Sequence, residues 1–227
     1  GSNIPTALPD DYDRRAWRQR AGAGDDDFLL AHFGFLNRSK GVDILLEDIA
    51  ALRRSHICPV KLVMIGGRTG SSDPANAAYA AEIDAQLERL GLAPIVHWTG
   101  FVDEQSVSAY LTASDVVVLP FRDGASFRRG SLMAAIQHGC AIITTEPKVY
   151  VSEFKDGENM LFVRPETLDP DVPPFFHTTH QILQLYRSAA LREQLREGAR
   201  QLTSRFDWEN IALRHIAFFD EILKGRR

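Results

Sequence analysis

Two adjacent arginines, Arg128 and Arg129, stand in a glycine- and serine-rich stretch between an apolar run and a helix-like run. The stretch, residues 120–140, reads PFRDGASFRRGSLMAAIQHGC. A helix N-terminus carries about half a unit of positive charge and several unpaired N–H groups, so two guanidinium groups there add repulsion. A bound phosphate would relieve that repulsion. The alternative is that both arginines are solvated or paired with Asp123.

A second cationic turn, GFLNRSKG at 34–41, follows an apolar run and carries Arg38 and Lys40. It has neither the Gly-x-Gly-x-x-Gly of a dinucleotide fingerprint nor the pattern of a P-loop. On its own, Lys40 would be interpreted as a solvated lysine. Two basic loops on one edge of a parallel sheet would instead make a site for a diphosphate that needs no metal.

The other chemistry-bearing residues give weaker signals. The seven histidines show no metal-ligand spacing, and the sequence has no Gly-x-Ser-x-Gly turn. His32 stands near the end of an apolar run, where a site histidine and a core histidine are both possible. Asp123 and Glu153 are the carboxylates best placed to meet a ligand hydroxyl, although loop carboxylates are usually solvated.

The elements that must position these residues alternate along the chain. Apolar runs predict strands, and stretches with helical spacing separate them, which implies a parallel sheet covered on both faces. Right-handed crossovers make this a doubly wound, Rossmann-like α/β sheet, in which ligands bind at the carboxyl ends of the strands. That rule selects the loops 34–40, 66–72, 100–104 and 123–131. The predicted strands are 28–34, 60–67, 95–100, 116–120, 141–145 and 160–163, and the predicted helices are 40–54, 75–91, 103–114 (with Asp103 as N-cap) and 131–139.

The 227 residues fit a single domain, 1–227, with an irregular N-terminal segment at 1–26 and a helical tail at 175–227. The chain has no initiator Met and is expected to be a piece of a longer protein. Its last helix carries one apolar stripe, formed by Trp208, Ile211, Ala212, His215, Phe219, Ile222 and Leu223. That stripe is expected to be partly exposed.

Composition narrows the possible classes of protein. A net charge of −4 argues against a general nucleic-acid binder. Cys58 and Cys140 both lie beside apolar segments, so we expect buried free thiols and a reducing, cytoplasmic location. No apolar stretch approaches the roughly 20 residues that span a bilayer, and no signal-peptide pattern is present.

Five stretches, in this order, resemble the C-terminal, donor-binding domain of the retaining glycosyltransferases of family four, which have the two-domain GT-B fold. No single stretch is decisive, but their order supports the fold assignment. They are GFLNRSKGVDILLEDI, KLVMIGG, LERLGLAPIVHWTGFVDEQSVSAYLTASDVVVLP, SEFKDGENMLFV and FDWENIA.

The resemblance assigns roles to a few positions. Lys40 matches the family's lysine that holds the donor diphosphate, and Gly34 matches the glycine that lets the phosphate approach. Glu153 matches a loop glutamate without a defined role.

The chain also departs from the family pattern. Phe35 stands where the family has arginine, and Ser126 and Ala134 stand where it has two glutamates eight positions apart. Arg128 and Arg129 are candidates to replace the missing cation.

The resemblance therefore implies a domain that binds a nucleoside-diphosphate sugar and transfers the sugar with retention. Lys40, Arg128 and Arg129 would stabilise the departing diphosphate, with no metal or other cofactor. The donor would also meet Gly34, Phe35, Arg38, Phe101, Asp123, Ser131 and Glu153. The acceptor, a glycan, lipid or small molecule, would bind an N-terminal domain that this chain lacks, and the full-length protein could associate peripherally with a membrane. The alternatives are a non-catalytic binding or interaction domain that has lost the glutamates, and a GT-B sugar-nucleotide epimerase.

Overall fold

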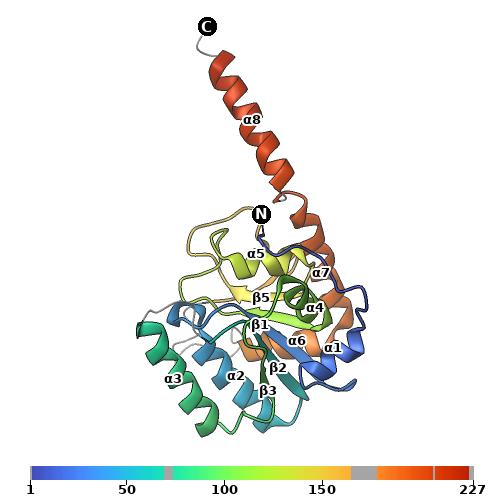
Figure 1. Cartoon of the computed structure of the whole chain (residues 1–227), viewed down its shortest axis with the longest axis vertical. Helices are drawn as coiled ribbons and strands as arrows, with labels where there is room; N and C mark the ends of the chain where they lie inside the picture. Colours follow the sequence, from blue (N-terminus) through green and yellow to red (C-terminus); the bar gives the residue numbers. More distant parts are fainter. Residues whose placement is uncertain (1, 69–73, 165–177, 207, 225–227) are drawn as a thin grey trace.

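The computed structural model describes residues 2–68, 74–164, 178–206 and 208–224. Within them, six strands form one sheet in the order β3-β2-β1-β4-β5-β6 (Figure 1). Every neighbouring pair is parallel, which confirms the predicted doubly wound sheet. The strands are β1 (Phe28–Phe33), β2 (Val60–Ile65), β3 (Val96–Trp98), β4 (Val116–Leu119), β5 (Ile142–Thr145) and β6 (Leu161–Val163).

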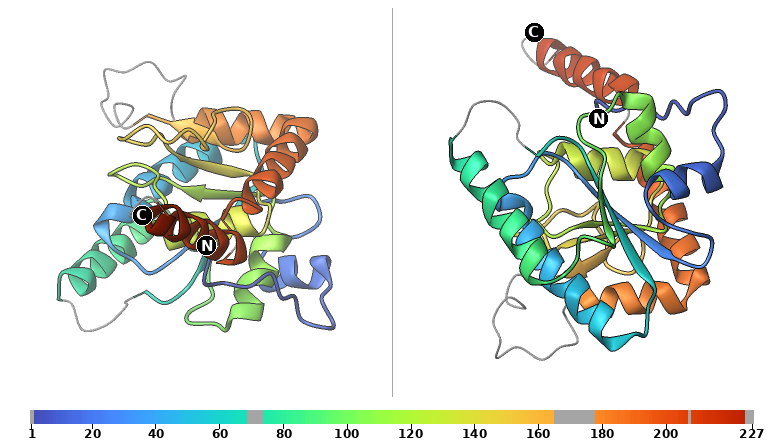
Figure 2. Two further views of the ribbon diagram at one scale, coloured as in Figure 1. Left: turned by 90° about the horizontal axis from the view of Figure 1, so that it is seen from above. Right: turned by 60° about the horizontal axis from the view of Figure 1, so that its bottom comes forward.

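Helices cover both faces of the sheet (Figure 2). One core joins the sheet to α2, α3 and α6, and the other joins it to α1, α4 and α5. Helix α7 contributes a buried side chain to each core, Leu195 to the first and Leu202 to the second. The helices are α1 (Arg14–Arg20), α2 (Val42–Ser55), α3 (Pro74–Arg89), α4 (Glu104–Ala113), α5 (Gly130–Gln137), α6 (Thr178–Arg187), α7 (Ala189–Thr203) and α8 (Trp208–Lys224), with a short 3₁₀ turn η1 at Arg38–Lys40.

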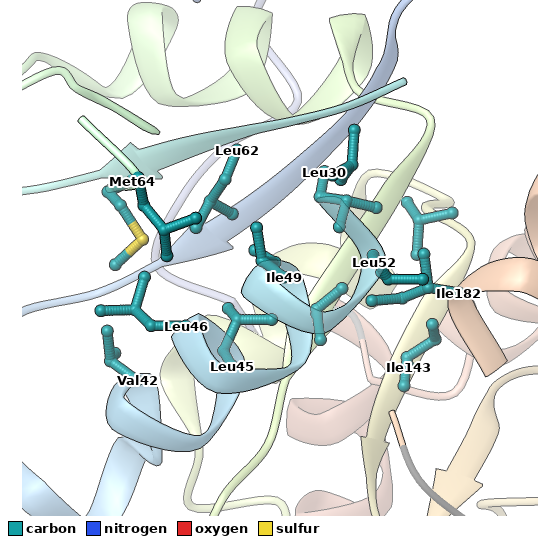
Figure 3. Packing of buried hydrophobic residues seen from close by; sticks show 14 of the residues in the cluster. Leu30, Val42, Leu45, Leu46, Ile49, Leu52, Leu62, Met64, Ile143 and Ile182 are labelled. Atoms are coloured by element: carbon teal, nitrogen blue, oxygen red, sulfur yellow. The ribbon is translucent and has the colours of Figure 1, made fainter. Parts of the chain in front are cut away.

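The helical spacing predicted for α2 is confirmed by its packing. Its periodic apolar residues are buried and lie against side chains from the same face of β1 and β2, including Leu30, Leu62 and Met64 (Figure 3). Burying each leucine contributes about 2 kcal/mol to stability. Leu29 and Ala31, which alternate with Leu30 along β1, belong to the core on the opposite face of the sheet.

The N-terminal segment 1–26 was predicted to be irregular, and the structure corrects this by placing α1 within it. Asp13 caps the helix by accepting the Ala16 N–H at 2.7 Å. Trp17 packs edge-on against Tyr110 of α4, with ring centroids 4.8 Å apart. Arg18 is buried in an ion pair with Asp115 at 2.9 Å. Partners about 95 residues away therefore stabilise this short helix, and the local composition of the segment does not reveal them.

Helix α8 points away from the body of the molecule (Figure 1) and has no buried residue. Its apolar stripe is exposed as expected, with Phe219 57 % and Leu223 64 % accessible. Near its start, the Trp208 indole donates a hydrogen bond to the Ser2 carbonyl at 3.1 Å. Among the described helices, none combines the length and apolar character that crossing a membrane would require.

Gly41 joins the turn η1 to α2 and has a left-handed backbone, with φ of +67°. A Cβ atom at this position would clash with the carbonyl oxygen of Pro120, which directly follows β4. Only glycine lets the two backbones come this close. The start of α2 is thereby held against the loop that follows β4.

We expect Gly41→Ala to destabilise the protein by about 3 kcal/mol or more, because it adds a backbone clash to an unfavourable φ. Gly157→Ala is the matched control, since Gly157 has a similar φ of +74° but nothing within 4 Å of the added methyl group. The control should cost only about 1 kcal/mol. Urea denaturation measures both, and equal losses would contradict the close contact at Pro120.

Candidate functional site

The two predicted basic loops meet where β1 and β4 lie side by side in the sheet. The first loop follows β1 and contains η1, and the second follows β4 and leads into α5. A cavity of about 490 Å³ opens beside them, and its lining includes Gly34, Phe35, Lys40, Phe101 and Ser131. These five predicted site residues come from three separate loops, and the fold brings them together at one edge of the sheet.

Lys40 is the central cation of this cavity. Its Nζ donates a hydrogen bond to Ser131 Oγ at 2.9 Å and lies 5.1 Å from the centre of the Phe121 ring. A Cβ atom on Gly34 would come within 3.3 Å of the same nitrogen, so the glycine leaves room beside the ammonium. Among the described residues, no carboxylate forms an ion pair with Lys40.

The electrostatic surroundings of Lys40 disfavour its positive charge. Burial, and to a smaller extent the neighbouring Arg129 guanidinium, lowers the pKa of Lys40 to about 8. The unpaired N–H groups at the start of α5 add positive potential near Ser131. An anion in this cavity would meet an ammonium group and a helix N-terminus at once.

Arg129 is the residue before α5 and makes no side-chain capping bond to the helix. Its guanidinium forms an ion pair with Asp123, donates to Ser39 Oγ at 3.3 Å and lies over the Phe121 ring at 4.8 Å. The sequence left open whether the arginines pair with Asp123 or face a phosphate. The structure shows that Arg129 pairs with Asp123 and also lies close enough to Lys40 to lower its pKa.

Arg128, by contrast, is exposed and makes no ion pair with the described residues. The two neighbouring arginines are therefore not equivalent. Only Arg129 has its guanidinium group next to the turn that carries Lys40.

Other predicted residues lie outside the lining of this cavity. Arg38 is exposed, pairs with Glu82 through hydrogen bonds of 2.6 and 2.8 Å, and lies 5.0 Å from the Tyr79 ring centre. Glu153 lines a different cavity, of about 400 Å³, beside α7, where it accepts the Ser152 hydroxyl at 2.9 Å. The structure therefore separates Glu153 from Lys40.

The structure assigns His32 to the core. Its side chain is fully buried, and its Nδ1–H donates to the Val118 carbonyl oxygen at 2.9 Å. Burial lowers the pKa of His32 to about 4, so the imidazole is neutral at pH 7. Of the two interpretations left open for His32, the core histidine agrees with this environment.

Sequence reasoning missed Asn37 and Glu104, which also line the main cavity. Asn37 Oδ1 accepts the Ser39 hydroxyl at 2.7 Å within the basic turn. Glu104 begins α4, directly after Asp103, which caps that helix as predicted by accepting the Ser106 N–H at 2.7 Å. The signal for Glu104 was its place in the loop 100–104, which the rule for parallel sheets had already selected.

Within the ranges that the structure describes, no three His, Cys, Asp or Glu side chains gather as a possible metal site. The chemical groups that line the cavity are the Lys40 ammonium, the Glu104 carboxylate, amide and hydroxyl groups and aromatic rings.

A cavity that contains a lysine and a helix N-terminus, at the switch point of a doubly wound parallel sheet, is typical of α/β proteins that bind nucleotides. Comparison with known families agrees with this class. Residues 27–184 match the family model described as glycosyl transferases group 1, and the chain belongs to that family.

Individual relatives show the same relationship. The chain is 27 % identical over 218 residues to a D-inositol 3-phosphate glycosyltransferase from Jonesia denitrificans, covering 93 % of this chain and 47 % of that protein. It therefore spans about half the length of this curated relative.

Solved structures share the fold at lower identity. HepE from Anabaena, in complex with UDP and glucose, is similar with a TM-score of 0.77 and 19 % identity, over 97 % of this chain and 55 % of that one. The C-terminal domain of the group 1 glycosyl transferase LpcC from Francisella tularensis is similar with a TM-score of 0.65 and 17 % identity. That match covers 90 % of this chain and 98 % of the domain.

The lowered pKa of Lys40 has a consequence for stability. The folded state releases this proton near pH 8 and the unfolded state near its ordinary pKa of 10.5. The unfolded chain thus binds more protons in that interval, and the contribution of Lys40 to stability rises from pH 8 to pH 10.5. Below pH 8 the buried ammonium is a net cost.

We therefore expect Lys40→Met to be more stable than the wild type at pH 7 by about 1 kcal/mol or more, with the difference shrinking toward pH 10. Urea denaturation in buffers free of phosphate measures it. Lys155→Met, at an exposed lysine paired with Glu158, should show no such gain. A Lys40→Met variant that is less stable than the wild type at pH 7 would contradict the electrostatic cost.

Proposed function

We propose that this chain is the donor-binding domain of a retaining glycosyltransferase, and that the cavity at Lys40 takes the diphosphate of a nucleoside-diphosphate sugar. One observation carries the proposal: a largely buried ammonium group has no carboxylate partner among the described residues and sits at the uncapped start of a helix. A diphosphate supplies the negative charge that this arrangement lacks.

In this proposal each group around the cavity has a simple task. Lys40 and the first N–H groups of α5 hold the phosphate oxygens, while Gly34 leaves space for them to approach. Arg129 adds charge from the adjoining loop, and Arg128 is available at the surface. When the bond to the sugar breaks, these cations stabilise the negative charge that develops on the departing nucleoside diphosphate. The proposal requires no metal or other cofactor.

The remaining lining suits the rest of such a donor. Phe35 and Phe101 are exposed aromatic residues, 46 % and 83 % accessible, and offer faces for a base or a sugar ring. UDP is the first nucleotide to test, because the similar HepE structure contains it. The acceptor would bind a domain outside this chain, and we propose a cytoplasmic location for the whole protein.

A second candidate is a domain of the same fold that binds nucleotide sugars without catalysis. Ser126 and Ala134 stand where the resembling family has its two glutamates, and Ala134 is completely buried among apolar residues of the core. The candidates share the diphosphate site, so both predict nucleotide binding. Only turnover by the full-length protein separates them.

The test is calorimetric titration of the 227-residue chain with UDP, GDP and ADP at pH 7. We expect one nucleotide to bind and Lys40→Ala to weaken it at least tenfold, or about 1.4 kcal/mol. Arg129→Ala should weaken binding more than Arg128→Ala, because only Arg129 has its guanidinium next to the Lys40 turn. Lys155→Ala, at an exposed lysine outside the cavity, is the matched control and should bind as the wild type does.

A second readout uses the titration of Lys40. At pH 8 about half of the free protein has a neutral Lys40, and a bound diphosphate favours the protonated form. Binding should therefore take up a fraction of a proton, which calorimetry in buffers of different ionisation enthalpy detects. Binding that is unaffected by Lys40→Ala, or no binding of any of the three nucleotides, would contradict the proposed site.

A further inference from the structure

A chain of polar contacts runs from α3 to the loop after β4 and passes through Asp43, in the first turn of α2. The hydroxyl of Tyr79, on α3, donates to Asp43 Oδ1 at 2.7 Å and accepts the Asp43 backbone N–H at 3.2 Å. The other carboxylate oxygen forms an ion pair with Arg122. Tyr79 is almost completely buried, so one end of this chain is fixed in the core.

The loop after β4 in turn forms hydrogen bonds to Ser39, the residue that precedes Lys40. The Arg122 backbone N–H donates to the Ser39 carbonyl at 3.0 Å, and the Arg129 guanidinium donates to the Ser39 hydroxyl at 3.3 Å. Ser39 is therefore held by its backbone and by its side chain. Together with the contact of Gly41 against Pro120, these bonds fix the turn at 38–41 relative to the loop.

Most of the cations on the two loops are paired with carboxylates. The two loops carry five cations, and three of them have carboxylate partners: Arg122 pairs with Asp43, Arg129 with Asp123 and Arg38 with Glu82. Among the described residues, the exposed Arg128 and the more buried Lys40 have no such partner. Without its carboxylate, the guanidinium of Arg122 would add a further unpaired charge next to the turn that carries Lys40.

We propose that Asp43 is a positioning residue of the Lys40 cavity. It does not line the cavity itself. By pairing with Arg122 and Tyr79, it holds the loop after β4 against the Lys40 turn, so that the ammonium stays within hydrogen-bond distance of Ser131 at the start of α5. This inference rests on the proposed anion site and concerns how that site is held in shape.

The test uses inorganic pyrophosphate as the probe, titrated calorimetrically at a temperature well below the unfolding of every variant. We expect Asp43→Asn to weaken pyrophosphate at least tenfold, because the amide loses the ion pair that ties Arg122, and with it the loop after β4, to α2. This loss of position has to outweigh the added positive charge, which by itself would attract the anion. Tyr79→Phe keeps the ion pair and should weaken binding by a smaller factor. Asp84→Asn is the matched control, since Asp84 lies on α3 and pairs with Arg68 outside this network, and it should bind within twofold of the wild type.

The decisive variant is the combination Asp43→Asn with Arg122→Gln. Two amides can hydrogen-bond to each other without an unpaired charge, although the shorter glutamine has to approach more closely than the arginine does. We expect the double variant to recover pyrophosphate affinity to within about threefold of the wild type, whereas a role confined to stability would change the unfolding temperature and leave affinity unaltered.

The outcomes separate this inference from the proposed function. Wild-type affinity in Asp43→Asn, or a double variant as weak as Asp43→Asn, overturns the role of Asp43. If Lys40→Ala still abolishes binding in that case, the proposed anion site stands. If the wild-type chain binds neither pyrophosphate nor a nucleoside diphosphate, both are overturned.

Discussion

The site depends on the burial of one ammonium group without a carboxylate to neutralise it. Lys40 lies between Phe121, Ser131 and Arg129, where burial lowers its pKa to about 8. Most proteins pair such a charge, because leaving it unpaired costs stability. Here no carboxylate among the described residues pairs with Lys40, and the protein retains an electrostatic cost that the proposed anion would remove. In the proposed site, the affinity for an anion and the loss of stability would thus have the same physical source.

The parallel sheet makes this arrangement possible. Because β1 and β4 are neighbours while their connections leave in opposite directions, two loops distant in sequence end side by side. Neither loop is rigid by its own composition, since both are rich in glycine, serine and charged residues. Their order comes from contacts between them: the Gly41 backbone against Pro120, and Ser39 held by Arg122 and Arg129. Loops whose composition favours flexibility can thus have a fixed geometry when contacts between them hold them in place.

Much of the architecture could be predicted from the sequence, because buried parallel strands appear as continuous apolar runs and their helices keep a 3.6-residue period. That Gly34, Lys40 and Ser131 lie at one cavity could be predicted as well, since the carboxyl ends of the strands converge. The remaining features depend on three-dimensional neighbours. The pairing of Arg129 with Asp123, the link from Asp43 to Arg122 and the place of Glu153 beside α7 follow from side-chain directions, which no spacing rule encodes. Helix α1 was missed for the same reason.

Helix α8 illustrates how unevenly stability is distributed in this chain. None of its residues is buried, so the two cores gain almost no free energy when it forms. An isolated helix of 17 residues is only marginally stable in water. The backbone amides of α8 should therefore exchange their hydrogens with solvent through local opening, many orders of magnitude faster than those of β1 at the centre of the sheet. In this chain, a helix and a sheet joined by one covalent backbone thus belong to separate cooperative units.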